Sequence, residues 1–517
     1  MSDTAPSNVL LVVLDTVRKD HLMPYGYDRE TTPELNTFAE EATVFDNAVA
    51  PAPWTLPVHA SMFTGQYPTE HGADQKSPYL DDVATLASIL SEGGYRTACY
   101  SSNAWITPYT NLTQGFDRQD SFFKAIPGDA LSGPLGRVWR AINDSDRLRS
   151  IASRLVRAGA KVHARFASSG ESDSKTPSVI DRTQSFIEDT DDDDWFAFVN
   201  LMDAHLPYYP PEEYRKQLAP DVDPAAVCQN SKEFNSGARD IDDEEWEAIR
   251  KLYDAELAHM DAELGRLFDW LRETGRWEET TVVVCADHGE LLGEHDLYGH
   301  EFALYDELIN VPLLVDHPSL EADRRDDLVE LLDLYHTILN ATGVDTGVIA
   351  EDVVPAAEKR SLVSGQYRAF DATDPADPGR RTLSRLEQDE DYAFVEYAQP
   401  LIELHHLEQK AAEAGITLPS DHRAYATMRA ARSVRAKYIE ADKIPDEGFR
   451  LDEDPEESSP VDPVDDEAVE GAEQALAAFC NEVGSEWDST AGPDAADPLA
   501  DADEEVRERL SDLGYVD

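Results

Sequence analysis

The sequence predicts an α/β fold in which a central, mostly parallel sheet is covered by helices on both faces. The first observation is three apolar runs that each end in a carboxylate, at 8–15, 196–203 and 280–287. Continuous apolar runs of this length are typical of strands buried on both faces of a parallel sheet. The second observation is that stretches with helical spacing of apolar residues alternate with these runs, as they do in a doubly covered sheet.

Further elements of this domain follow from the same patterns. Weaker strands are expected at 97–101 and 311–315. Apolar residues recur at helical spacing in five stretches, at 34–41, 85–92, 181–189, 244–274 and 326–342. These elements place an α/β domain over residues 1–343.

The pattern changes beyond this domain. Residues 392–397 and 425–440 resemble strands of a smaller antiparallel sheet, which we place in a subdomain over 344–450. Residues 451–517 form an acidic segment that is expected to be partly irregular, because Asp, Glu, Pro, Ala and Ser dominate it. A helix is expected within it at 467–483.

The charge of the chain is extreme. Asp and Glu number 105 against 44 Lys and Arg, which gives a formal net charge of −61 over 517 residues. Such repulsion opposes compaction unless it is screened, and the Debye length shrinks to ~3 Å in molar salt. Since the acids are spread along the chain, they predict a surface adapted to concentrated salt. A local acidic patch for a basic partner is the alternative interpretation. Both argue against nucleic acid as a partner.

Cysteine spacing and hydropathy argue against further classes of protein. The four cysteines, Cys99, Cys228, Cys285 and Cys480, are far apart, so neither disulfides nor a structural zinc site is expected. Residues 1–7 are short and polar, and no run reaches the ~18 apolar residues of a membrane span. The sequence therefore predicts a cytoplasmic protein without a membrane span.

Two strand ends carry residues suited to a metal ion. Asp15 ends a buried strand, where a carboxylate needs a partner such as a divalent cation; a turn or a helix cap is the alternative. Asp287 and His288 end another strand and offer oxygen and nitrogen ligands, which suit Mn²⁺ or Zn²⁺. His295 and His300 follow within a few residues, so an incidental solvated loop is the weaker interpretation.

Thr55 is a third candidate. It lies near the start of a helix that the sequence places from Ala60 onward. A hydroxyl near a helix N-terminus lies where backbone N–H groups and the helix dipole favour an anion. The alternative is that Thr55 only caps this helix.

The order of these motifs resembles the sulfatase family of the alkaline-phosphatase-like superfamily over almost the whole chain. The motifs are NVLLVVLDTVRKDH at 8–21, TLPVHASMFTGQYPTEHG at 55–72, MDAHLPY at 202–208, ADHGELLGEH at 286–295, VPLLV at 311–315, SVRAKYIEAD at 433–442, LDEDPEE at 451–457 and LGY at 513–515. The resemblance implies an alkaline-phosphatase-like sandwich whose catalytic domain spans 1–343.

The resemblance also implies roles for individual residues. Asp15, Asp287 and His288 match metal ligands, and Thr55 matches the nucleophile, which also contacts the metal. His205 matches a histidine that contacts the ester or its leaving group. His300 stands where many relatives have a Lys that binds the transferred group, and His59 stands where they have Arg. Asn103 and Asp203 are looser matches to substrate contacts, and Asp203 could instead orient His205 or bind a second metal.

The departures from the family pattern shape the functional hypothesis. Relatives have Cys or Ser in the nucleophile position, where it is oxidised to formylglycine; Thr55 cannot form that aldehyde, so no formylglycine is expected. Thr16 replaces a second Asp. We therefore expect one divalent ion (Mn²⁺, Zn²⁺, Ca²⁺ or Mg²⁺) and cleavage of a small-molecule or glycan ester of sulfate, phosphate or phosphonate. A phosphodiesterase or phosphoglycerol-type transferase, and a noncatalytic binding protein, are the alternatives.

Overall fold

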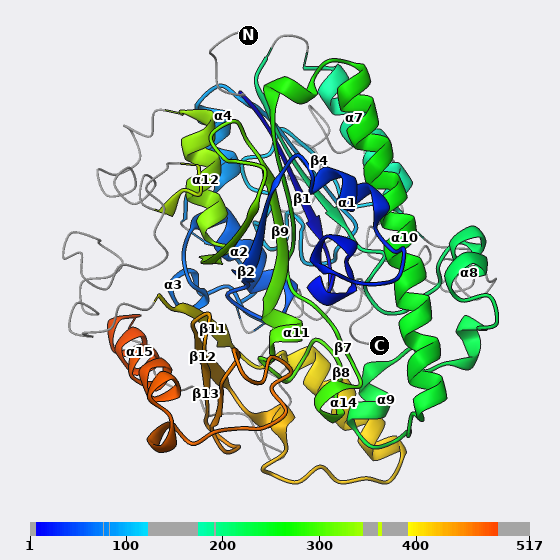
Figure 1. Cartoon of the computed structure of the whole chain (residues 1–517), viewed down its shortest axis with the longest axis vertical. Coiled ribbons are helices and arrows are strands. Elements are labelled where there is room, and N and C mark those ends of the chain that lie inside the picture. The colour runs from blue at the N-terminus through cyan, green and yellow to red at the C-terminus, as the bar shows by residue number, and fades with distance from the viewer. Residues whose placement is uncertain are drawn as a thin grey trace, which may run out of the picture.

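An eight-stranded sheet runs through the centre of the larger part of the molecule (Figure 1), in the order β10-β2-β9-β6-β1-β5-β3-β4. The computed structural model describes residues 7–75, 77–81, 83–122, 174–190, 193–344, 360–363 and 391–483. The strands of the sheet are β1 (Asn8–Leu14), β2 (Thr43–Val49), β3 (Arg96–Ser101), β4 (Arg118–Asp120), β5 (Trp195–Leu201), β6 (Thr280–Ala286), β9 (Asn310–Asp316) and β10 (Arg324–Glu330). Of these strands only β9 is antiparallel to its neighbours, so the predicted, mostly parallel sheet is confirmed.

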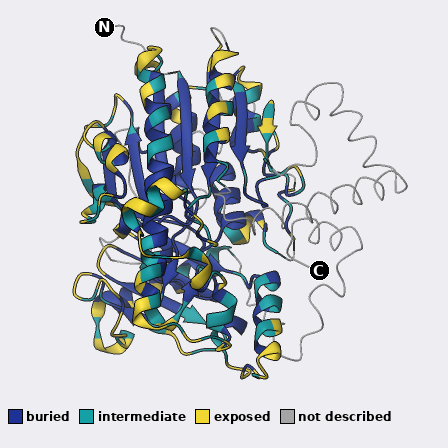
Figure 2. Ribbon diagram, turned by 90° about the vertical axis from the view of Figure 1, so that its right-hand side faces the viewer, coloured by how far each residue is buried: buried dark blue, intermediate teal, exposed yellow. Residues whose placement is uncertain are grey.

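Helices cover both faces of this sheet, as Figure 1 shows. On one face lie α1 (Pro33–Phe38), α7 (Thr176–Glu188) and α10 (Asp243–Glu273), and on the other lie α2 (Thr55–Thr64), α4 (Leu86–Glu92) and α12 (Asp333–Thr342). Figure 2 shows the strands buried between helices that keep one side toward solvent. The three central strands β1, β5 and β6 are buried at every position. Burial on both faces explains why their sequences are continuously apolar.

The register of the central strands defines the edge at which the polar residues collect. Leu14, the last residue of β1, lies opposite both Ala286 and Leu201, the last residues of β6 and β5. The residues that follow, Asp15 and Asp287, therefore leave the sheet at the same level. Ligands in open α/β sheets bind at this carboxyl edge.

A smaller antiparallel sheet lies below the first, as Figure 1 shows. It consists of β11 (Ala393–Tyr397), β12 (Met428–Arg432), β13 (Lys437–Ala441) and β14 (Glu447–Phe449). The helix α15 (Glu467–Val483) packs against β12 and β13, and Phe479 stacks on Phe394 with 4.2 Å between ring centroids. Short elements complete the described chain: α3 (Pro68–His71), α8 (Glu212–Leu218), α9 (Ser231–Asn235), α11 (Asp306–Ile309), α14 (Leu401–Glu413), β7 (Leu291–Leu292) and β8 (Tyr298–Gly299).

Two predictions about elements are wrong in instructive ways. The helix expected at 326–342 is a strand, β10, followed by α12; pairing of β10 with the edge of β2 overrides the helical spacing of its apolar residues. The helix expected from Ala60 begins at Thr55, because Pro57 falls in the first turn, where its missing N–H costs little. The helix predicted at 467–483 is present with those bounds.

One buried cation joins the two sheets. The Lys437 side chain on β13 is fully buried, and its Nζ contacts Asp306 Oδ1 at 2.8 Å, Glu457 Oε1 at 2.6 Å and the Leu304 carbonyl at 2.9 Å. Asp306 begins α11, directly after which β9 of the large sheet starts. The smaller sheet is thereby tied by ionic contacts to the polypeptide that leads into β9.

We expect Lys437→Met to lower the free energy of unfolding by about 3–5 kcal/mol, because it leaves the buried Glu457 carboxylate without its cation and Asp306 with Arg432 alone. Arg435→Met is the matched control, since the Arg435 side chain is 55% exposed and its 3.7 Å pair with Asp452 is open to solvent. That control should change the free energy by at most about 1 kcal/mol. Denaturant unfolding in matched salt measures both, and equal effects would contradict the assigned role of Lys437.

Candidate active site

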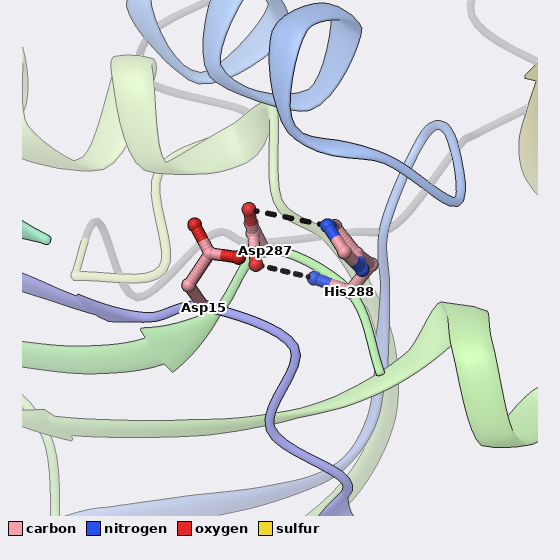
Figure 3. Close-up of side chains that lie close together, drawn as sticks. All are labelled: Asp15, Asp287 and His288. Carbon is pink, nitrogen blue, oxygen red and sulfur yellow. Dashed lines mark hydrogen bonds and ion pairs between the residues drawn. The ribbon is translucent and has the colours of Figure 1, made fainter. Parts of the chain in front are cut away.

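Three predicted residues meet at the carboxyl edge of the large sheet. Asp15, Asp287 and His288 each place one ligand atom within 4.8 Å of the others, and all three are buried (Figure 3). Among the residues that the structure describes, they form the one group of at least three His, Cys, Asp or Glu side chains with this spacing. The aligned ends of β1 and β6 produce the cluster directly.

Two amides hold the Asp15 carboxylate. Asn103 Nδ2 donates to Asp15 Oδ2 at 2.8 Å, and Asn200 Nδ2 donates to the same oxygen at 3.2 Å. Ser101 Oγ donates to Asn200 Oδ1 at 2.8 Å and so orients that amide. With Oδ2 held in this way, Asp15 Oδ1 is buried and has no hydrogen-bond partner.

The Asp287 carboxylate is arranged in the same way. Its Oδ1 accepts the backbone N–H groups of Thr16 at 3.2 Å and His288 at 2.9 Å, while its Oδ2 is buried without a hydrogen-bond partner. Burial raises the pKa of Asp287 to about 7, although these N–H donors oppose the shift. A full negative charge is therefore unfavourable here without a nearby cation.

His288 completes the set as a neutral ligand. Its Nδ1–H donates to the Gly289 carbonyl at 3.0 Å, which leaves the Nε2 lone pair free to point at the cluster. Burial lowers its pKa to about 3, so the ring is uncharged at neutral pH. Two orphaned carboxylate oxygens and an imidazole Nε2 are ligand types of Mn²⁺ and Zn²⁺, so the residues present fit a divalent ion.

Thr55 lies beside this cluster as the first residue of α2. Its buried hydroxyl accepts from Asn103 Nδ2 at 3.2 Å and lies 3.5 Å from His288 Nε2. The presence of this hydroxyl also opposes, to a small extent, the rise in the pKa of Asp287. The side chain thus faces the candidate metal ligands instead of capping the helix, and the N-terminal N–H groups of α2 surround it.

His205 and His300 lie next to the cluster. The His300 ring is 4.5 Å from that of His288 and 5.4 Å from that of His205, centroid to centroid. His300 Nδ1 lies 3.2 Å from Glu290 Oε1, and burial lowers the pKa of His300 to about 4. His205 Nδ1 is 2.6 Å from the Leu206 carbonyl, which leaves its Nε2 as the free ring nitrogen.

His59 is placed behind the cluster. It is fully buried one turn along α2, its Nδ1–H donates to the Thr55 carbonyl at 2.9 Å, and its ring packs edge-on against Phe198. Its Nδ1 is 3.8 Å from Asp287 Oδ2. This position suits support of Asp287 more than contact with a substrate.

The Asp203 carboxylate has partners other than His205. It accepts from the hydroxyl of Thr176 at the start of α7, and its Oδ1 lies 3.6 Å from Nε2 of His259 on α10. The expected substrate contact and the orientation of His205 by Asp203 therefore have no support in this geometry.

Two residues beside the cluster were not predicted from the sequence. Asn200 holds Asp15, and Glu290 contacts His300. A lone amide within the otherwise apolar 196–201 was a usable signal for Asn200, because a buried polar side chain needs a partner. Glu290 belongs to the motif that contains His288, but no pattern in the sequence places it against His300.

The eight-stranded sheet, the smaller sheet and the cluster at the strand ends define a protein of the alkaline-phosphatase-like class. The sequence profile of the sulfatase family matches residues 7–344. The chain belongs to the sulfatase family and is an ester hydrolase.

Similar proteins agree with this assignment. The choline-sulfatase of Rhizobium meliloti (strain 1021) is 23% identical over 514 residues, which cover 94% of this chain and 88% of that protein. The structure of the phosphonate monoester hydrolase of Agrobacterium radiobacter superposes with a TM-score of 0.62 at 19% identity, covering 92% of this chain and 96% of that one. The structure of a 2-O GAG sulfatase superposes with a TM-score of 0.59 at 17% identity, covering 98% of this chain and 96% of that one. In the described residues, no helix is both long and apolar enough to cross a bilayer.

We expect Asp15→Asn to weaken Mn²⁺ binding by at least about tenfold, because it removes the charge of one ligand. Asp203→Asn is the control, since this carboxylate is engaged by Thr176 and His259 away from the cluster. Isothermal calorimetry on protein stripped with a chelator measures both. Equal losses would show that Asp203 belongs to the metal site.

The same titration should depend on pH. Metal binding needs the Asp287 carboxylate in its charged form, and its pKa is raised to about 7 by burial. The affinity for Mn²⁺ is therefore expected to rise by about tenfold per pH unit below pH 7 and to level off above it, as displacement of one proton requires. A flat profile would contradict the raised pKa.

Proposed function

We propose that this chain cleaves a sulfate or phosphonate ester by attack of the Thr55 hydroxyl. The observation that carries the proposal is the position of Thr55 Oγ1, 3.5 Å from His288 Nε2 and beside two carboxylates with an orphaned oxygen each. A nucleophile, a set of metal ligands and the N-terminus of α2 thus converge on one point, the arrangement that transfer of an anionic group requires.

The proposal includes one divalent ion held by Asp15, Asp287, His288 and Thr55. Bound there, the ion would supply Lewis acidity, favouring the ionised form of the Thr55 hydroxyl and stabilising charge on the transferred group. The neutral His288 and the two aspartates favour Mn²⁺ or Zn²⁺ over Ca²⁺ and Mg²⁺.

The chain's own residues then account for the two steps. The Thr55 oxygen, whose proton has passed to solvent, forms a bond to the sulfur or phosphorus atom. The bond to the leaving oxygen breaks, and His205 or His300 donates the proton which that oxygen needs. Asn103 Nδ2 donates to Asp15 Oδ2 at 2.8 Å and to Thr55 Oγ1 at 3.2 Å and so orients the attacking oxygen.

Release completes the cycle. Because a threonine ester has no aldehyde hydrate through which to eliminate, a water molecule must attack the sulfur or phosphorus a second time, and the Thr55 oxygen leaves with a proton. An acceptor alcohol in place of water would make the protein a transferase of the phosphoglycerol type. The family to which the chain belongs and the similar phosphonate monoester hydrolase favour the hydrolase.

A panel of nitrophenyl esters tests the proposal directly. The panel contains the sulfate, the phosphate monoester, a phosphodiester and a phosphonate monoester, assayed in molar KCl with Mn²⁺. Thr55→Ala should lower kcat by at least about a thousandfold, as loss of a nucleophile does, whereas Thr55→Ser, which keeps the hydroxyl, should retain activity. Full activity of Thr55→Ala would overturn the nucleophile assignment.

The pattern across the panel separates the alternatives. Release from the sulfate and the phosphonate supports the proposed hydrolase, and release from the diester alone favours a phosphodiesterase. Turnover that appears only when an acceptor alcohol is added indicates a transferase. A protein that binds no Mn²⁺ and hydrolyses no ester would be a binding protein on this fold.

A further inference from the structure

Beside His300, the site carries buried charged side chains that the proposed reaction does not use. His300 lies between two carboxylates: its Nδ1 is 3.2 Å from Glu290 Oε1, and its Nε2 is 4.0 Å from Glu301 Oε1. Glu290 is fully buried and Glu301 is 4% exposed. One further oxygen on each, Glu290 Oε2 and Glu301 Oε2, is buried without a hydrogen-bond partner. A charged Glu301 carboxylate at this place would repel an anionic ester.

A lysine from a different part of the fold offsets one of them. Lys232 on α9 places its Nζ on Glu301 Oε1, the same oxygen that His300 Nε2 approaches. Its side chain is 17% exposed. Burial alone would lower the pKa of Lys232, but the charges of Glu301 and Glu403 raise it above its usual value. Among the ion pairs of the described residues, Lys232 is the one Lys or Arg that pairs with Glu301.

The backbone around this lysine is built to hold it there. Asn235 on the same short helix makes two hydrogen bonds with the backbone of Tyr298. Its Nδ2 donates to the Tyr298 carbonyl at 2.7 Å, and its Oδ1 accepts from the Tyr298 N–H at 2.9 Å. Gly299 follows with φ +94°, and a Cβ there would lie 2.7 Å from Glu301 Oε2 and 3.0 Å from Ser231 Cβ. Only glycine lets α9 and the carboxylate come this close.

We propose that Lys232 sets the charge of the subsite that receives the anionic part of the ester, by neutralising Glu301 beside His300. The inference rests on the proposed function and adds a positioning residue to it. The family resemblance places a lysine at the position of His300, and here a lysine from α9 pairs with the carboxylate beside His300. With Glu301 neutralised, the faces of His300 and His205 can accept a sulfate, phosphonate or phosphate group.

The consequence is a change in binding and not in the chemical step. In Lys232→Met, the Glu301 carboxylate remains beside His300, and its repulsion of an anion in a partly buried site is expected to weaken binding by about tenfold or more. KM should rise by that factor with kcat little changed, because the charge on the group is present before and during the reaction. Binding of a dianion should be weakened more than binding of a monoanion.

The test compares four variants in the metal-loaded full chain. Lys232→Met should raise both KM for the ester that the protein hydrolyses and the calorimetric Kd of inorganic phosphate at pH 8. Lys232→Arg should keep KM and Kd close to those of the unaltered protein, because it retains the positive charge. Lys232→Met combined with Glu301→Gln should do the same, because the negative charge of Glu301 is then removed as well. Lys410→Met is the control, since Lys410 on α14 pairs with Glu233 of α9 at 3.1 Å and its side chain is 31% exposed.

Each outcome is decisive. A double variant as impaired as Lys232→Met alone, or a Kd for phosphate unchanged by Lys232→Met, would overturn the inference. If the Lys232→Met chain does not fold, the double variant and Lys232→Arg still distinguish charge from packing. If no ester is hydrolysed at all, the proposed function fails, while the Kd of phosphate still measures the charge of the subsite.

Discussion

The structure depends on the burial of two carboxylates at the ends of neighbouring strands. Asp15 and Asp287 leave β1 and β6 at the same level, and each keeps one oxygen without a hydrogen-bond partner. Burying such groups costs on the order of several kcal/mol unless a cation or hydrogen-bond donors offset this cost. The central sheet, whose strands are buried on both faces, provides the packing that tolerates this cost.

Much of the surrounding backbone serves to hold these two groups in place. Thr16 directly follows Asp15 and adopts φ +58°, a conformation that costs a β-branched residue energy, so that its N–H reaches Asp287 Oδ1. The Tyr253 hydroxyl of α10 donates to the Thr16 carbonyl at 2.9 Å. On the other side, a Cβ on Gly289 would lie 1.9 Å from the Glu307 carbonyl oxygen. The strain at Thr16 is therefore stored where it orients a candidate metal ligand.

The sequence could predict what depends on periodicity and strand ends. Asp15, Asp287 and His288 could be placed together because carboxyl ends of parallel strands meet at one edge, and Thr55 could be added through the motif it begins. The helix expected at 326–342 failed because pairing of β10 with β2, 275 or more residues away in sequence, decides its conformation. Lys232 and Glu301 could not be connected either, since their contact depends on how α9 docks on β8. The packing of α9 on β8 produces no periodic pattern in the sequence from which it could be predicted.

The exchange of basic residues for histidines changes how the site handles charge. A lysine beside the transferred group carries a fixed positive charge, whereas His300, whose pKa is lowered to about 4 by burial, is neutral at working pH. A neutral imidazole can accept or donate a proton but attracts an anion weakly. In the proposed function, the attraction comes from the candidate metal ion and from the N–H groups at the start of α2, while Lys232 removes the opposing charge of Glu301. The charge that the resemblance assigns to one lysine is, in this proposal, distributed over several groups, each of which can be altered without changing Thr55.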